Sequence, residues 1–290
     1  MLLRIISAIV IVVIILLILV MIIDCHRFVI REYDFKTSKI DKEIKIIFLS
    51  DLHGKSFGIS NIKLKEAIRK QKPDLIAVGG DMISAVKKDE TGMISDFIND
   101  IGTIAPVYYS VGNHELKTEI NSSKYGNRYI KYKESLCHNG TVFLENQKAD
   151  FSENIEMFGL SLPIEFYKKG KRKECESAYI RQLLNIPSAE KLSILLAHNP
   201  DYLDAYADWG ADLVLSGHYH GGLMRLPGIG GIIGPRLNLF PRFDAGRYVF
   251  KDTTMILSCG LGTHTLPIRI FNPGEISVVS IKPEANSHDI

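Results

Sequence analysis

The sequence predicts an α/β fold in which strands alternate with helices that cover both faces of a sheet. Short apolar runs alternate with segments of helical periodicity in β-α-β-α-β order over residues 44–111. These runs are continuously apolar, as in sheets with two buried faces. The 290 residues are 46% hydrophobic and 23% charged, which is typical of a globular chain with a sizeable core.

A charge-free apolar run of 19 residues, from residue 5 to residue 23, precedes this domain. At ~1.5 Å per residue, a helix of that length spans about 28 Å, close to the hydrocarbon thickness of a bilayer. A cleaved signal peptide is the alternative, but its apolar region is usually about 7–15 residues long and ends in a small-x-small site. This run ends in Met-Ile-Ile-Asp-Cys-His, and Asp24 also disfavours lipoprotein cleavage before Cys25. We therefore expect residues 1–25 to be an uncleaved transmembrane anchor and residues 26–43 to be a linker.

Two features of the sequence point to opposite orientations of this span. Arg4 precedes the span, whereas four basic residues between positions 27 and 39 come after it, and the positive-inside rule then favours a cytoplasmic domain. Against that count, a short N-terminal arm before a single span commonly acts as a signal anchor that exports the downstream domain. We expect a single-pass cell-membrane protein with an extracytoplasmic catalytic domain.

The elements follow in order after the anchor. A polar stretch over residues 34–45 leads into a strand at 44–50, and Pro73 ends a helix at 59–72. A strand at 74–79, a helix at 91–101 and a strand at 106–111 complete the alternation. Further strands are predicted at 155–160, 192–197, 212–215, 254–258 and 276–281, with antiparallel pairs late in the chain. One domain over residues 44–290 is the simplest organisation.

Composition excludes several classes of function. The net charge of +2 gives no indication of a nucleic-acid partner, because such proteins usually carry a clustered basic face. The four cysteines are far apart and have no CxxC spacing, so neither a zinc ribbon nor a dense disulfide framework is supported.

Polar, glycine-flanked segments follow five of the predicted strands. In open α/β sheets, ligands collect beyond the carboxyl ends of the strands, so these segments should converge in one crevice. The segments are Ser-Asp-Leu-His at 50–53, Gly-Gly-Asp at 79–81, Gly-Asn-His-Glu at 112–115, His-Asn at 198–199 and Gly-His-Tyr-His at 217–220.

Each segment alone is most simply an ordinary turn. Together they place five of the nine histidines, two aspartates and Asn113 at strand ends. Imidazole and carboxylate are the ligands that Zn²⁺, Mn²⁺ and Fe accept, and His218 and His220 could share one ion or divide between two. The set therefore favours a metal site.

The ordered motifs DxH, GD, GNHE, H and GHxH over residues 50–220 resemble those of the calcineurin-like metallophosphoesterases. The resemblance implies a four-layer α/β/β/α sandwich of mixed sheets. Segments at 221–227, 243–246 and 260–263 are similar to the membrane-anchored bacterial phosphodiesterase-like subgroup. Leu223 departs from that subgroup, which often has glutamine there.

The resemblance also implies the roles of the site residues. Asp51, His53 and His220 would hold one divalent ion, Asn113, His198 and His218 the other, and Asp81 would bridge both together with a hydroxide. Two ions chosen from Mn, Fe and Zn fit these ligands. His114 would be catalytic, either protonating the leaving alkoxide or stabilising the charged transition state. Glu115 would orient His114 or cap the following helix.

The implied function is hydrolysis of a phosphodiester or pyrophosphate by in-line attack of the bridging hydroxide. A long apolar segment at 223–243, directly after the last histidines, is either packed structure or an apolar surface that admits a lipid-like phosphodiester. The alternative is a membrane-anchored module that binds metal or phosphate without turnover. The complete set of predicted ligands, with His114 present, favours the enzyme.

Overall fold

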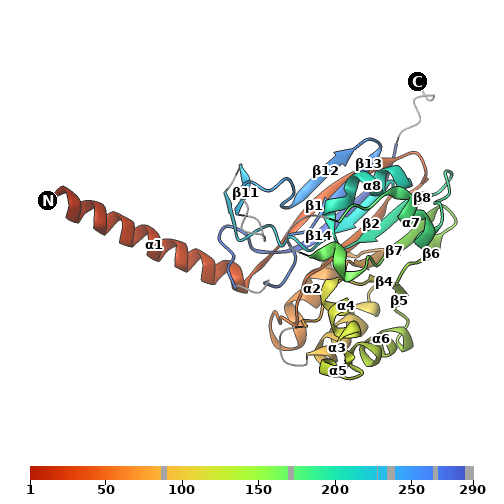
Figure 1. The fold of residues 1–290 in the computed structure, drawn as a ribbon, viewed down its shortest axis with the longest axis horizontal. Helices are drawn as coiled ribbons and strands as arrows, with labels where there is room; N and C mark the ends of the chain where they lie inside the picture. Colours follow the sequence, from red (N-terminus) through yellow and green to blue (C-terminus); the bar gives the residue numbers. More distant parts are fainter. Residues whose placement is uncertain (86–89, 169–172, 227, 234–238, 264–266, 285–290) are drawn as a thin grey trace.

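Two six-stranded sheets lie against each other, and helices cover the outer face of each sheet (Figure 1). This computed structural model describes residues 1–85, 90–168, 173–226, 228–233, 239–263 and 267–284. The four-layer α/β/β/α arrangement of mixed sheets predicted from the sequence is confirmed.

The first sheet has the strand order β1-β14-β2-β3-β4-β5. All neighbouring pairs are parallel except β14 with β2, which is antiparallel. Its strands are β1 (Phe28–Thr37), β2 (Ile44–Leu49), β3 (Leu75–Val78), β4 (Val107–Ser110), β5 (Val142–Leu144) and β14 (Gly274–Pro283).

The second sheet has the order β12-β13-β9-β8-β7-β6, with antiparallel pairs at its two edges and parallel pairs between them. Its strands are β6 (Gln147–Ser152), β7 (Ile155–Leu160), β8 (Leu192–Ala197), β9 (Leu213–Ser216), β12 (Gly246–Phe250) and β13 (Thr253–Leu257). A separate antiparallel hairpin contains β10 (Met224–Leu226) and β11 (Gly230–Ile233).

The helices connect the strands and cover the sheets. The α-helices are α1 (Leu2–His26), α2 (Ile62–Gln71), α3 (Thr91–Gly102), α4 (Asn113–Ile120), α5 (Ser122–Tyr125), α6 (Arg128–His138), α7 (Ser177–Leu184) and α8 (Leu203–Trp209). Short 3-10 turns are η1 (Ile59–Asn61), η2 (Ile164–Tyr167) and η3 (Pro200–Tyr202).

Three buried clusters account for the layers, because strand residues alternate between the two faces of each sheet. Ile46 and Phe48 of β2 face the second sheet, where they join Ile194 of β8 in the cluster between the sheets. Ile47 of β2 points the other way and packs in a cluster with residues of α2, α3 and α6. A third cluster joins the outer face of the second sheet to α7 and α8, and Trp209 is its largest fully buried side chain.

Most of the segment expected to be a linker, residues 26–43, forms the strand β1. This strand pairs in parallel with β14 over ten residues, from Phe28 beside Gly274 to Thr37 beside Pro283. Tyr33 and Phe35 pack in or against the cluster between the sheets, and the exposed charged residues Glu32, Asp34 and Lys36 alternate with them. The prediction missed this strand because the charged residues of an edge strand resemble those of a polar connection.

The segment at 223–243, expected to be an apolar loop, contains the β10–β11 hairpin; residues 227 and 234–238 lie outside the described residues. Among the described residues of this segment, the side chains of Ile229, Leu239 and Phe240 are about two-thirds exposed. This hairpin lies on the side of the globular part from which α1 projects (Figure 1).

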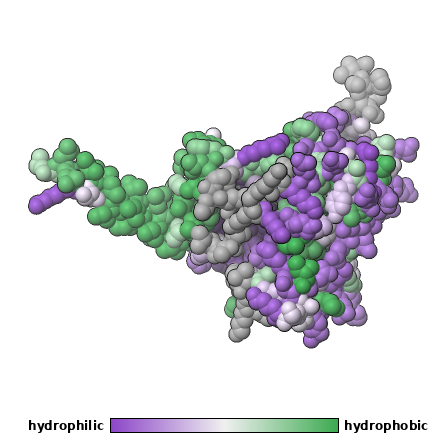
Figure 2. All heavy atoms as spheres, viewed as in Figure 1, coloured by the Kyte–Doolittle hydropathy of each residue, from purple (hydrophilic) through white to green (hydrophobic). Residues whose placement is uncertain are grey.

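Within the part of the chain that is described, α1 is the one helix long and apolar enough to cross a membrane. Its side chains are exposed along most of its length, and Figure 2 shows this apolar surface standing away from a largely hydrophilic globular part. Arg27 alone separates α1 from β1, so the helix joins the domain without a flexible spacer.

Candidate metal centre

The predicted site residues lie at the carboxyl ends of five strands from both sheets. Parallel strands β2, β3 and β4 deliver Asp51 with His53, Asp81 and Asn113, while β8 and β9 deliver His198 and the pair His218 and His220. Six of the seven predicted ligands are buried, and His218 is half-buried. The five segments therefore converge, as expected, at the carboxyl ends of these strands.

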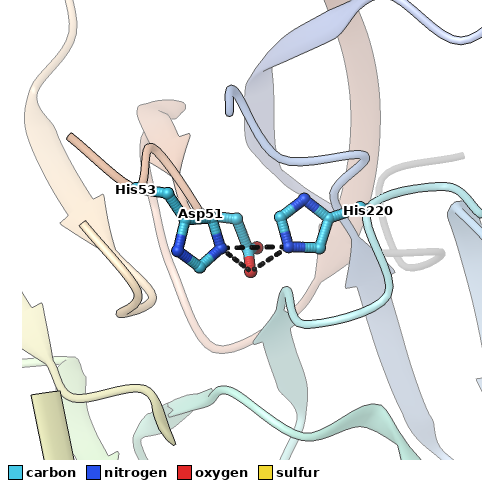
Figure 3. A group of neighbouring side chains, drawn as sticks. All are labelled: Asp51, His53 and His220. Atoms are coloured by element: carbon cyan, nitrogen blue, oxygen red, sulfur yellow. Dashed lines mark hydrogen bonds and ion pairs between the residues drawn. The ribbon is translucent and has the colours of Figure 1, made fainter. Parts of the chain in front are cut away.

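Asp51, His53 and His220 form the first group of potential ligands (Figure 3). The Nε2 atoms of His53 and His220 are 3.1 Å apart, and Nε2 of His220 is 3.3 Å from Oδ1 of Asp51. Two ligands about 2.1 Å from one tetrahedral ion are separated by about 3.4 Å, so these spacings fit a shared ion.

Asp81, His198 and His218 form another group. Oδ2 of Asp81 is 3.2 Å from Nε2 of His198 and 3.8 Å from Nε2 of His53, which belongs to the first group. The Asp81 carboxylate thus lies between the two groups, as a bridging ligand must. Which residues bind which ion stays a prediction.

An unusual backbone conformation marks this site. Five of the seven predicted ligands have a positive φ: Asp51 (55°), His53 (48°), Asp81 (54°), His218 (72°) and His220 (52°). This region costs residues with a side chain about 1–2 kcal/mol, because Cβ approaches the following carbonyl oxygen. Such strain persists where the surrounding structure enforces it, and it clusters at functional sites.

Two glycines make this crowding sterically feasible. A Cβ atom on Gly217 would lie 2.2 Å from Oδ2 of Asp51, and one on Gly112 would lie 2.2 Å from Oδ1 of Asp81. Any larger residue would displace a predicted ligand. The glycines beside the motifs are therefore required by close approach of the chain to the two carboxylates.

The charges of the site are strongly coupled. Burial alone would lower the pKa of His198, but the adjacent Asp81 and Asp51 carboxylates raise it to about 10. Burial opposes ionisation of Asp81, yet the adjacent His198 holds its pKa well below the ordinary value. Without metal, the cluster thus retains a proton on an imidazole. Metal uptake must displace that proton, so metal affinity rises with pH.

The residues present fit divalent metal ions. Nδ1 of His198 lies 2.7 Å from the carbonyl oxygen of Gly79, so Nδ1–H donates to that oxygen and Nε2 is the nitrogen that would bind a metal once its proton is displaced. Oδ1 of Asn113 is buried and has no hydrogen-bond partner among the described residues. A buried amide oxygen without a donor is costly, and a cation beside it would satisfy it.

Hydrogen bonds from the chain fix the two carboxylates. Asp51 accepts hydrogen bonds from the Ser50 hydroxyl at 2.6 Å and from the backbone N–H of His218 at 3.0 Å. Asp81 accepts one from the backbone N–H of His114 at 2.7 Å. Each carboxylate is thus oriented by the loop that supplies another site residue.

The part of the chain that forms this site matches a known protein family. The model of the family described as calcineurin-like phosphoesterase matches residues 44–222, which contain every predicted ligand. The chain belongs to the calcineurin-like phosphoesterase family. The matched residues contain a candidate dimetal site of buried histidines and aspartates.

Relatives of the chain occur in several bacteria, and the chain spans less than two thirds of the length of the relative from Campylobacter jejuni. The chain is 30% identical over 260 residues to an uncharacterized metallophosphoesterase of Campylobacter jejuni, covering 87% of this chain and 63% of that protein. It is 29% identical over 222 residues to phosphodiesterase YaeI of Escherichia coli, covering 76% of this chain and 75% of that protein. A dimetal phosphatase from Danio rerio aligns in structure with a TM-score of 0.41 and 11% identity, covering 76% of this chain and 88% of that one.

His114 lies beside the predicted metal ligands. One of its ring nitrogens is within 4.8 Å of ligand atoms of His53 and Asp81. Its Nδ1 accepts a hydrogen bond from the backbone N–H of Ala85 at 3.0 Å. Because Nδ1 accepts, the ring proton resides on Nε2, which is the nitrogen left to act as a donor.

Glu115 has a larger role than the predicted helix cap. It does cap α4, since its carboxylate accepts from the backbone N–H of Gly112 at 3.1 Å. The same carboxylate accepts from the backbone N–H groups of Asp81 and Met82 and from the Tyr109 hydroxyl, each at 2.8 Å. Burial and then the charge of Asp81 raise its pKa to about 7. Glu115 therefore holds the strained turn that contains Asp81.

Sequence reasoning gave no role to three residues near the site. The Tyr167 ring packs edge-on against His218, with centroids 5.3 Å apart. The buried Arg269 donates to the carbonyl oxygens of Cys259 and Gly260 in the loop beside Asp51, at 2.8 and 3.1 Å. Asn272 is fully buried behind His220. Tyr167 and Asn272 adjoin no recognisable motif, so only the fold reveals their positions.

Proposed function

We propose that this protein is a membrane-anchored phosphodiesterase that uses two divalent ions. It would belong to the bacterial phosphodiesterase-like subgroup of its family. The observation that carries the proposal is the buried Asp81 carboxylate between two groups of imidazoles at strand ends. Asp51, His53 and His220 would hold one ion, Asn113, His198 and His218 would hold the other, and Asp81 would contact both. The ions would be Mn, Fe or Zn, which accept this mixture of nitrogen and oxygen ligands.

When bound, such ions supply Lewis-acid polarisation of the phosphate and a deprotonated water for in-line displacement. The chain supplies orientation and a dry environment. The buried Ser50 hydroxyl and His218 N–H hold Asp51, and Glu115 holds the turn of Asp81. These contacts fix the carboxylates before substrate arrives, which lowers the reorganisation needed during the reaction.

His114 would stabilise the transition state as a hydrogen-bond donor. Full protonation of its ring would place an N–H at Nδ1 against the N–H of Ala85, two donors facing each other. The neutral ring with the proton at Nε2 keeps the Ala85 contact and can donate to a phosphoryl oxygen or to the departing oxygen. This arrangement favours charge stabilisation over complete proton transfer to the leaving alkoxide.

The substrate we propose is a lipid-like phosphodiester. Ile229 lies in the turn of the hairpin that follows the predicted metal-binding histidines, and Leu239 and Phe240 come after the hairpin. All three side chains are exposed. The hairpin lies on the side from which α1 leaves the globular part (Figure 1). An apolar surface beside a membrane helix suits a substrate whose acyl chains remain in the bilayer.

We further propose that α1 is retained as a single membrane span with the catalytic domain outside the cytoplasm. Asp24, in the last turn of α1, is 1% exposed and bonded to the domain, which disfavours removal of the helix by a signal peptidase. Fusions of alkaline phosphatase and of a fluorescent protein to the C-terminus test the orientation. Active phosphatase is the expected result, and a phosphatase-negative, fluorescent cell would overturn it.

The activity is tested on the full chain in detergent, because shortening it to Ile40 would delete β1. With Mn²⁺, Zn²⁺, Mg²⁺ or Fe²⁺ added after chelation, we expect hydrolysis of a chromogenic phosphodiester and a preference for a diacyl phosphodiester over soluble diesters. Phe240→Ser should lower turnover of the lipid substrate alone. Ile186→Ser, an equally exposed site remote from α1, serves as the control.

The outcomes separate the alternatives. A protein that binds two ions but hydrolyses no ester would be the catalytically silent module. A protein that binds no metal would refute the whole proposal. A clear preference for soluble nucleotides, or equal effects of the two serine variants, would refute the lipid-like substrate while leaving the phosphodiesterase intact.

A further inference from the structure

Hydrogen bonds link the last turn of α1 to the loops that carry Asp51, His53 and His220, the first group of predicted ligands. The link to the His220 loop runs through Asn272. We propose that Asp24 and Asn272 are positioning residues of the metal centre, joining the end of α1 to the backbone of His220. The proposal concerns the helix end and the globular domain, and it holds whether or not α1 crosses a membrane.

Asp24 is placed where a carboxylate is normally unfavourable. It lies in the C-terminal turn of α1, where the helix dipole disfavours a negative charge, and it is only 1% exposed. Its Oδ2 accepts a hydrogen bond from the backbone N–H of Asn272 at 2.9 Å, and its Oδ1 accepts from Arg27 at 2.8 Å. These specific partners offset the cost of burial and dock the helix end on the domain.

Asn272 continues the connection to the metal site. Its side-chain Nδ2 donates to the carbonyl oxygens of His220 and Gly222, at 2.7 and 2.8 Å. The two hydrogen bonds close around Gly221, where a Cβ atom would lie 2.4 Å from Oδ1 of Asn272. His220 has a φ of 52° and its neighbour Gly221 a φ of 70°. Asn272 thus clamps a strained turn that aims an imidazole at the site.

A second contact ties α1 to the loop of the other histidine in this group. The Lys55 ammonium donates to the carbonyl oxygen of Cys25, one of the carbonyls at the end of α1 that lack a partner within the helix. Lys55 lies two residues beyond His53. The helix end is therefore linked to the loops of both histidines of the first group, directly through Lys55 and by way of Asn272 to the backbone of His220.

This arrangement predicts a local effect rather than a general one. Loss of the Asp24 contact would free Asn272 and loosen the turn at His220. Supporting partners of metal ligands typically contribute about 10–100-fold to metal affinity. The group that contains His198 and His218 has its own support, including the Gly79 carbonyl, and should keep its affinity.

The test is calorimetric titration of the full-length protein in detergent with Mn²⁺ alone, which does not depend on the ester that is hydrolysed. Asp24→Ala should weaken one of two Mn²⁺ sites by about 10-fold or more and leave the other within about twofold. Asp24→Asn keeps an acceptor oxygen for Asn272 and should restore most of the affinity. Arg27→Ala is the matched control, because it removes the ion pair but not the Asn272 contact.

A double-mutant cycle identifies the affected site. In a His220→Ala background the first site is already disrupted, so adding Asp24→Ala should cause no further loss at the remaining site. Asp24→Glu, which keeps the charge but displaces the acceptor, gives a milder version of the same result if the alanine variant does not fold. Equal weakening of both sites, additive effects in the cycle, or unchanged affinities would each overturn the proposal.

Discussion

Replacing Asp81 by asparagine is expected to abolish stable binding of both metal ions and, with it, hydrolysis. Oδ1 would still accept from the N–H of His114, so the loop should keep its conformation. The change replaces the charged Oδ2, 3.2 Å from Nε2 of His198 and 3.8 Å from Nε2 of His53, by an uncharged amide. Loss of a supporting partner costs about 10–100-fold in metal affinity, and we expect loss of a shared ligand to exceed about 100-fold.

Metal content after dialysis and turnover with added Mn²⁺ measure this effect. Asp100→Asn is the matched control, because that carboxylate is 52% exposed and pairs with Lys65 at the surface, where an ion pair contributes at most about 1 kcal/mol. A variant at Asp81 that retained two ions would show that the carboxylate is not shared, and the assignment of the centre would have to change.

Replacing His114 by asparagine is expected to lower kcat by about 10²–10⁴-fold while leaving metal content unchanged. The asparagine Oδ1 occupies roughly the place of Nδ1 and can still accept from the N–H of Ala85, so the loop keeps its anchor. The Nε2–H donor is lost. The effect should therefore appear in kcat with two ions still bound, which distinguishes His114 from a ligand.

His138→Asn, at the exposed end of α6, makes the same chemical change far from the site and should have no effect. Turnover of the His114 variant equal to that of the unmodified protein would remove the catalytic role. Loss of one ion from that variant would instead make His114 a metal ligand.

Much of the fold could be predicted because its signals are local. The strands β2, β3, β4, β7, β8 and β9 are short apolar runs that end within a residue or two of the predicted bounds. Edge strand β1 was missed, because its charged residues hide the strand pattern and its partner, β14, lies more than 240 residues away. Pairing over such a separation leaves no mark in either segment alone.

The candidate site divides in the same way. The sequence alone determined which residues are polar and glycine-flanked at strand ends, because a parallel strand must deliver the residues after it to the carboxyl edge of its sheet. On that basis it identified Asp51, Asp81 and His198 as members of one centre. A strand that is buried on both faces needs continuous apolar residues. The end of each strand that precedes a site residue could therefore be recognised in the sequence.

Only the tertiary structure decided how those residues are held. The left-handed turns at Asp51 and His220, the hydrogen bond from Ala85 to His114, and the bonds from Asp24 through Asn272 all depend on contacts between distant segments. Local sequence sets which conformations a residue can adopt at low cost. Packing between the two sheets and the end of α1 selects a costlier one, because the contacts formed there offset the backbone strain.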